Sequence, residues 1–184
     1  MVGVALDIQK MVSPAWFCCC PSQIAGGPVC GILPLMQWSL VHIGGRSTKL
    51  DGVDAQVTVY LERCESFAHC RSEVFRTEAA MLAWLTRQQG RTAPVVVLLD
   101  VGGRQMASET FAAWLGARRD AGAQQIIFAV GPASGWSDAA RSRAQLLLSL
   151  GPMTLAHALA RLVIAEQLYR AFTILSGHPY HGGH

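Results

Sequence analysis

The stretch PVVVLLD, Pro94–Asp100, decides the fold of this chain, because it is a nearly continuous apolar run. Such runs are typical of β-strands that are buried on both faces of a sheet. A second run of this kind, QIIFAV at Gln125–Val130, follows, and the intervening Glu109–Ala121 has the spacing of an amphipathic helix. Ser108 is the expected N-cap of this helix and Gly122 its end. The order strand, helix, strand predicts an α/β fold with a largely parallel sheet.

Toward the C-terminus the same alternation continues. Ser137 is the expected cap of a third helix that runs to about Gln145, and Leu146–Leu150 is a short apolar strand. A long closing helix is predicted over His157–Leu175. It leads into the polar tail Ser176–His184.

Upstream, the pattern becomes regular from Met36 onward. Gln37–Ile43 predicts a strand, and Glu73–Phe75 predicts a second, short one. Ala55–Leu61 alternates in the manner of a strand but fits a helix equally well. Thr77–Gln89 opens with a capping residue and predicts a helix. We therefore expect residues 36–184 to form a single domain.

Residues 1–35 differ from the rest of the chain in composition. They hold four of the six cysteines, one lysine and one aspartate. Proline and glycine interrupt every apolar run, so the segment fits neither a secretory signal nor a membrane span. We interpret 1–35 as a disordered extension or the product of a start site upstream of the true one.

The composition excludes several classes of protein. Of the 184 residues, 51% are hydrophobic and 15% charged, with a net charge of +3, which argues against disorder and against a polybasic nucleic-acid binder. Thirteen of the fifteen basic residues are arginine. This bias suits bidentate phosphate contacts, but an arginine-rich proteome explains it as well. The cysteines lack metal-site spacing, so we expect no metal, and Cys64 and Cys70 fit thiols of a reducing compartment, the cytoplasm.

Three predicted strands end in glycine-bearing loops, at 99–103, 130–135 and 150–154. Loops beyond the carboxyl ends of parallel strands form the binding crevice of open α/β sheets. We therefore expect a ligand crevice here, although Gly-Pro turns also simply end strands. No dinucleotide fingerprint, phosphate-binding loop, nucleophile elbow or zinc-protease motif is present, which disfavours nucleotide enzymes and common hydrolases.

The last part of the chain concentrates polar chemistry. His157 and Arg161 are four residues apart on the closing helix and share a face. Glu166 and Arg170 have the same spacing, in the order that favours an ion pair on a helix. The tail holds the cluster His178–His181 (HPYH), which is typical of a segment that docks rather than frays.

The residues from Pro94 onward resemble the ribosomal large subunit methyltransferase H (RlmH) family. The resemblance is most specific in MTLAH at 153–157, RLVIAEQLYRA at 161–171 and the terminal HPYH. Residues 36–93 resemble the family more weakly, and 1–35 have no counterpart in it.

This resemblance implies a SPOUT-type fold with a deep C-terminal trefoil knot, a homodimer, and methylation of N3 of a pseudouridine in 23S rRNA within the assembled ribosome. S-adenosylmethionine is the implied cofactor. Carried over position by position, its pocket consists of Leu99, Gly131, Gly151, Pro152, Met153, Thr154, Leu155 and Ala156.

Four residues are implied to act on the substrate. We expect His157 to orient the target base or accept its proton, and Arg161 to stabilise the developing anion or hold a phosphate. Tyr180 and His181 are expected to shape the pocket and contact the base.

The chain departs from the family pattern at three places. The loop Val130–Gly135 replaces the usual G-G-P-E-G, no proline flanks His157, and Gly177 stands where the family has asparagine. The alternative function is therefore a non-catalytic SPOUT-like module that binds RNA or the ribosome with an impaired cofactor pocket.

Overall fold

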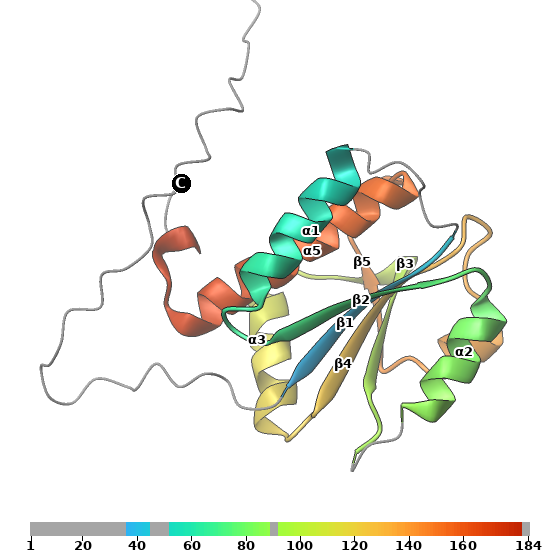
Figure 1. The fold of residues 1–184 in the computed structure, drawn as a ribbon, viewed down its shortest axis with the longest axis horizontal. Helices are drawn as coiled ribbons and strands as arrows, with labels where there is room; N and C mark the ends of the chain where they lie inside the picture. The colour runs from blue at the N-terminus through green and yellow to red at the C-terminus, as the bar shows by residue number, and fades with distance from the viewer. Residues whose placement is uncertain (1–35, 45–51, 89–91, 182–184) are drawn as a thin grey trace, which may run out of the picture.

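The computed structural model describes residues 36–44, 52–88 and 92–181. Its centre is a five-stranded sheet in which every neighbouring pair is parallel, as the sequence predicts (Figure 1). The strand order is β2-β1-β4-β3-β5. The strands are β1 (Gln37–Ile43), β2 (His69–Phe75), β3 (Val95–Gln105), β4 (Gln125–Val130) and β5 (Leu146–Ser149).

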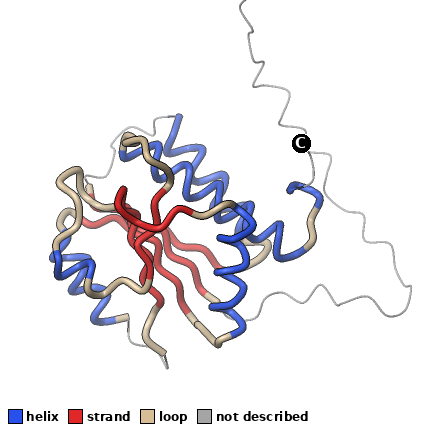
Figure 2. Tube along the Cα trace, turned by 180° about the vertical axis from the view of Figure 1, so that it is seen from behind, coloured by secondary structure: helices blue, strands red, loops and turns tan. Residues whose placement is uncertain are grey.

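Helices cover both faces of the sheet and make three layers (Figures 1 and 2). One face carries α1 (Gly52–Cys64), α3 (Ser108–Asp120) and α5 (His157–Ser176), and the other carries α2 (Glu78–Arg87) and the short α4 (Asp138–Arg141). After α5 comes a 3-10 turn, η2 (Pro179–His181).

The core beneath α1, α3 and α5 is rich in aromatic rings. Trp38 of β1 stacks on Phe128 of β4 with ring centroids 5.8 Å apart, and meets Phe172 of α5 edge-on at 5.0 Å. All three side chains are essentially inaccessible to water. Because buried aromatic rings contribute large apolar areas, this contact fixes α5 against the sheet.

The ambiguous segment Ala55–Leu61 lies within α1. The helix buries Val57 and Cys64, two turns apart, and leaves none of the residues between them buried, so the spacing of a helix describes this segment better than the alternation of a strand. The predicted strand Glu73–Phe75 is the end of the longer β2, which lies at the sheet edge and has no fully buried residue.

Two predicted caps have different outcomes. Ser137 caps α4 as expected, accepting a hydrogen bond from the Ala140 amide at 3.2 Å, but the helix ends at Arg141 rather than near Gln145. The prediction for Ser108 is wrong: Ala107 precedes α3, and the Ser108 hydroxyl donates to Gln167 Oε1 at 2.8 Å. A contact with a distant helix thus replaces the local cap.

The third strand is longer than the apolar run that predicted it. It continues past Asp100 through Gly102 and Gly103 to Gln105, with a register shift against β5 between Leu99 and Arg104. A Cβ on Gly103 would lie 2.6 Å from the Leu147 carbonyl carbon, so only glycine fits there. The segment predicted as a loop is therefore an irregular part of β3.

The interpretation of residues 1–35 lies outside the described residues. Within the described part, no helix has both the length and the apolar character that a membrane span requires.

Candidate functional site

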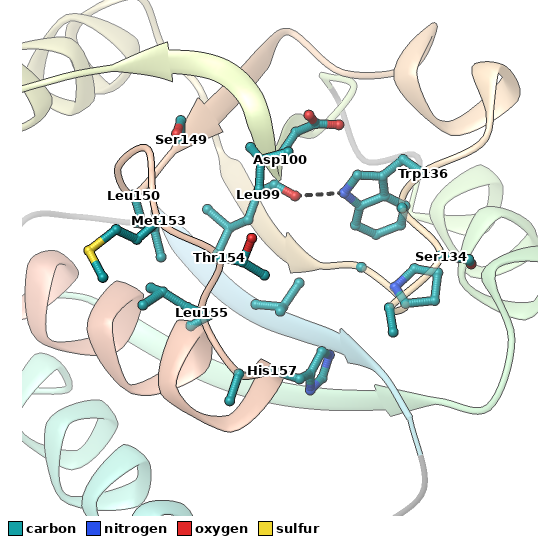
Figure 3. A pocket seen from close by; sticks show the side chains of 18 of the residues that line it. Leu99, Asp100, Ser134, Trp136, Ser149, Leu150, Met153, Thr154, Leu155 and His157 are labelled. Carbon is teal, nitrogen blue, oxygen red and sulfur yellow. Dashed lines mark hydrogen bonds between the residues drawn. The ribbon is translucent and has the colours of Figure 1, made fainter.

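A cavity of about 690 Å³ lies at the carboxyl ends of β4 and β5 and beside the middle of β3, next to the segments where the sequence predicts its three glycine loops (Figure 3). Every residue assigned to the cofactor pocket by resemblance lines it, except Pro152. Its walls are formed by Leu99, Asp100, Val101, Val130, Gly131, Pro132, Ala133, Ser134, Gly135, Trp136, Arg141, Ser149, Leu150, Gly151, Met153, Thr154, Leu155, Ala156, His157 and Ala160. The fold thus gathers residues from β3 and from the loops after β4 and β5 around one space.

Trp136 joins β3 to the loop after β4. Its indole Nε1 donates a hydrogen bond to the Leu99 carbonyl oxygen at 2.8 Å, a contact drawn in Figure 3. A Cβ on Gly131 would come within 2.7 Å of the Trp136 ring. The ring beside Gly131 leaves no room for a side chain there, and it holds the middle of β3 against the loop after β4.

Asp100 carries the buried charge of the cavity wall. Its Oδ1 accepts a hydrogen bond from the Gly102 amide at 2.9 Å, and its Oδ2 pairs with Arg141 Nη2 at 2.9 Å. The carboxylate side chain is 6% exposed, whereas that of Arg141 is 45% exposed. The arginine thus neutralises a buried carboxylate from the solvent side.

Two hydrogen bonds between Ser149 and Gly151 fix the start of the loop after β5. The Ser149 hydroxyl donates to the Gly151 carbonyl oxygen at 3.0 Å and accepts from the Gly151 amide at 3.3 Å. Gly151 has φ +140°, and a Cβ there would meet no atom within 4 Å. Because Gly151 has no side chain and the space beside it is open, a ligand can approach its backbone closely.

His157 begins α5 and faces the cavity (Figure 3). Burial and, secondly, the charge of Arg161 lower the pKa of His157, while the backbone of Val130 and Gly131 opposes the shift. The imidazole is therefore uncharged at neutral pH, the form that accepts a proton.

Arg161 lies one turn further along α5 and does not line the cavity. Its Nη2 pairs with Asp54 Oδ1 of α1 at 2.6 Å, and the two side chains are only 14% and 17% exposed. The ion pair ties α1 to α5 directly behind His157.

Tyr180 lies away from this cavity in the single chain, and His181 follows it in η2. The Tyr180 hydroxyl lies 3.4 Å from Glu166 Oε1, its ring meets Tyr169 edge-on at 4.8 Å, and the Arg170 guanidinium lies 5.2 Å from its centroid. Burial raises the pKa of Tyr180 to about 12. The tail docks on α5, as the sequence indicates, but at a distance from His157.

The predicted ion pair between Glu166 and Arg170 forms, with a shortest separation of 2.7 Å. The site residues that the sequence did not single out are Trp136, the pair of Asp100 and Arg141, and Asp54. Asp100, inside the first predicted glycine loop, and Trp136, directly after the second, carried a local sequence signal. In the described residues no group of three or more histidine, cysteine, aspartate or glutamate side chains could hold a metal ion.

Comparison with known proteins assigns this chain to a family. A family model described as "Predicted SPOUT methyltransferase" matches residues 36–181. The chain is 46% identical over 149 residues to the ribosomal RNA large subunit methyltransferase H of Koribacter versatilis, covering 81% of this chain and 100% of that protein. It is 55% identical over 86 residues to the protein of the same name from Brucella ovis, covering 47% of this chain and 51%, about half, of that relative.

Among solved structures, the chain is similar to the SpoU methyltransferase AviRb from Streptomyces viridochromogenes in complex with the cofactor AdoMet, at 14% identity and a TM-score of 0.41. That match covers 76% of this chain and 60% of AviRb. The match of the family model and the full-length match to a relative at 46% identity show that this chain belongs to the SPOUT methyltransferases, and within them to the ribosomal RNA large subunit methyltransferase H family.

Proposed function

We propose that this chain transfers the methyl group of S-adenosylmethionine to N3 of a pseudouridine in 23S rRNA, within the assembled ribosome in the cytoplasm. The observation that carries the proposal is the cavity beside β3 and at the ends of β4 and β5, which brings the pocket residues implied by the family resemblance to one place, Pro152 excepted. The relatives named as rRNA methyltransferases support the class of substrate.

The residues present fit the proposed cofactor. A cavity of about 690 Å³ is within the range that holds a ligand of this size. Leucine and methionine side chains give it apolar walls, and Gly131 and Gly151 leave backbone groups open to a polar edge. When bound, S-adenosylmethionine supplies a methyl group on a positively charged sulfur.

The chain itself contributes mainly by positioning, because methyl transfer requires the nucleophile in line with the bond that breaks. N3 of pseudouridine must lose its proton, and the uncharged His157 on the cavity wall is our candidate to accept it. Arg161 does not line the cavity and is paired with Asp54, so it would stabilise the developing anion through its charge rather than by holding a phosphate.

Substitution tests these two roles. We expect His157→Ala and Arg161→Ala each to lower methyl transfer at least tenfold, within the usual range for a lost acid–base or charge-stabilising group. His69→Ala, at an exposed histidine on β2, is the matched control and should retain activity. Wild-type rates in both the His157 and Arg161 variants would remove them from the mechanism.

We further propose that the enzyme is a homodimer with a C-terminal trefoil knot. Val101, Met153 and Leu159 are large apolar side chains that are 72%, 76% and 45% exposed, and the first two border the cavity. Exposed apolar surface of this kind supports contact with a second copy. In such a dimer, Tyr180 and His181 of one protomer would complete the cavity of the other.

The net charge of +3 is a weak electrostatic footprint for an RNA binder, which supports recognition of a preassembled particle by shape. We expect efficient methyl transfer to ribosomes and little to short naked RNA. Strong turnover on a short RNA would contradict this part of the proposal.

A second candidate is a non-catalytic module that binds RNA or the ribosome. The departure of Val130–Gly135 from the family's usual loop favours it. Calorimetry with S-adenosylmethionine separates the two functions, since binding supports the enzyme. Absence of binding at millimolar ligand would favour the module.

A further inference from the structure

His42 is a buried titratable residue that the proposed mechanism does not use. It is next to last in β1 and lies on the same face as Trp38 and Leu40, which belong to the core beneath α1 and α5. Its side chain continues that buried row and is 7% exposed. An imidazole thus stands at a position that the strand alternation assigns to the core.

The ring of His42 packs against His157. The two ring centroids are 5.7 Å apart with an interplanar angle of 61°, an edge-on contact. A Cβ on Gly44 would lie 3.9 Å from His42 Cδ2 and 4.0 Å from His157 Cε1, so the rings meet at the end of β1. His157 lines the cavity and His42 does not, which places His42 behind it.

The charged and titratable groups around His42 come from two helices. His157 and Arg161 face it from α5, and Asp54 faces it from α1. Burial, followed by the charges of Arg161 and His157, lowers the pKa of His42 to about 4, against a smaller opposing effect of Asp54. At neutral pH His42 is therefore a flat, uncharged ring and a poor proton acceptor.

Hydrogen bonds do not fix the contact between the two rings. Among the described residues, neither His42 Nδ1 nor His157 Nε2 has a hydrogen-bond partner, and both atoms are buried. Packing against the His42 ring and the backbone of Val130 and Gly131 therefore set how His157 stands against the cavity.

We propose that His42 is a positioning residue: its ring supports His157 from behind, holds it at the cavity wall and shields it from water. The inference rests on the proposed role of His157 in methyl transfer. The position requires an aromatic ring that fills the space. Phenylalanine at position 42 should therefore preserve the function of the histidine, whereas alanine should not.

The test uses the full chain and compares His42→Ala with His42→Phe, with Leu40→Ala as the matched control from the same face of β1. NMR titration of the His157 ring is measured beside kcat and KM for S-adenosylmethionine. In His42→Ala we expect the pKa of His157 to rise by roughly half a unit or more, because water enters the space. We expect kcat to fall about tenfold with KM changed less than about threefold, the pattern of lost positioning without lost binding.

His42→Phe should restore both the His157 titration and kcat, and Leu40→Ala should lower stability without moving either. An unchanged His157 titration in His42→Ala, the same shift in Leu40→Ala, or a Phe variant that behaves as the Ala variant would each overturn the proposal. Because the titration needs no substrate, it tests the placement of His42 even if the wild-type chain transfers no methyl group, which would instead refute the proposed function.

Discussion

At the scale of single residues, Gly131 has the most direct consequence for the cavity. A methyl group there would press on the Trp136 ring at 2.7 Å. We expect Gly131→Ala to lower the free energy of unfolding by about 1–3 kcal/mol, the usual cost of overpacking, and to weaken binding of S-adenosylmethionine. Urea unfolding and calorimetry measure the two effects.

Gly52→Ala is the control for this substitution, because a Cβ on Gly52, at the exposed start of α1, meets nothing within 4 Å. It should leave both stability and cofactor binding unchanged. Equal losses in the two variants would show that Trp136 does not constrain Gly131.

His42 makes stability depend on pH. Its folded pKa of about 4 lies below the ordinary 6.5, so the unfolded chain binds a proton first as the pH falls. The free energy of unfolding therefore falls as the pH drops from 6.5 to 4, and His42 accounts for about 3 kcal/mol of this fall at most. The lowered pKa of His157 acts in the same direction.

His42→Phe should therefore flatten the fall in unfolding free energy over this pH range, measured by urea unfolding at a series of pH values. Leu40→Ala, which removes a buried side chain that does not titrate, should keep the wild-type slope. A slope in His42→Phe as steep as in the wild type would show that His42 titrates normally in the folded chain.

At the scale of elements, α5 ends where the backbone turns left-handed. Gly177 has φ +68°, its amide bonds to the Ile174 carbonyl at 3.1 Å, and the His178 amide bonds to the Thr173 carbonyl at 2.9 Å. The family's asparagine tolerates the same conformation, so the exchange of asparagine for glycine here is conservative.

Gly177→Val should lower the unfolding free energy by about 1–2 kcal/mol, and Gly177→Asn should cost clearly less, because a β-branched residue resists positive φ. Ser176→Val, at the exposed last residue of α5, controls for the new side chain. Thermal unfolding measures the order of stability of these variants. Equal losses of stability in Gly177→Val and Gly177→Asn would contradict the expectation.

The sequence predicts best those elements whose pattern is local. The strands β1 and β4 and the helix α5 depend on their own apolar spacing, and their bounds are predicted within a residue. Ser108 and the end of β3 are missed because partners distant in sequence decide them: Gln167 takes the hydroxyl, and Leu147 leaves room only for Gly103.

The same limit applies to the site. Glycine loops at strand ends indicate the cavity, because parallel strands bring their carboxyl ends together. The partners that shape it, Trp136 with Leu99 and Arg161 with Asp54, are separated by a strand or more along the chain, so no spacing rule identifies them.

At the scale of the whole molecule, the core beneath α1, α3 and α5 includes Met36 and Trp38, and the family model also begins at residue 36. We expect a chain that begins at Met36 to fold and to dimerise as well as the full chain. Sedimentation and thermal unfolding compare the two. A shortened chain that is unfolded or monomeric would show that residues 1–35 are structural.

The central claim is that the cavity at the strand ends supports methyl transfer to the ribosome. The most direct measurement is transfer of radiolabelled methyl from S-adenosylmethionine to ribosomes from a strain that lacks this modification. We predict label at N3 of a single pseudouridine in 23S rRNA with the wild-type chain and little or none with His157→Ala. No label above background with the folded wild-type chain, or equal label with His157→Ala, would contradict the account.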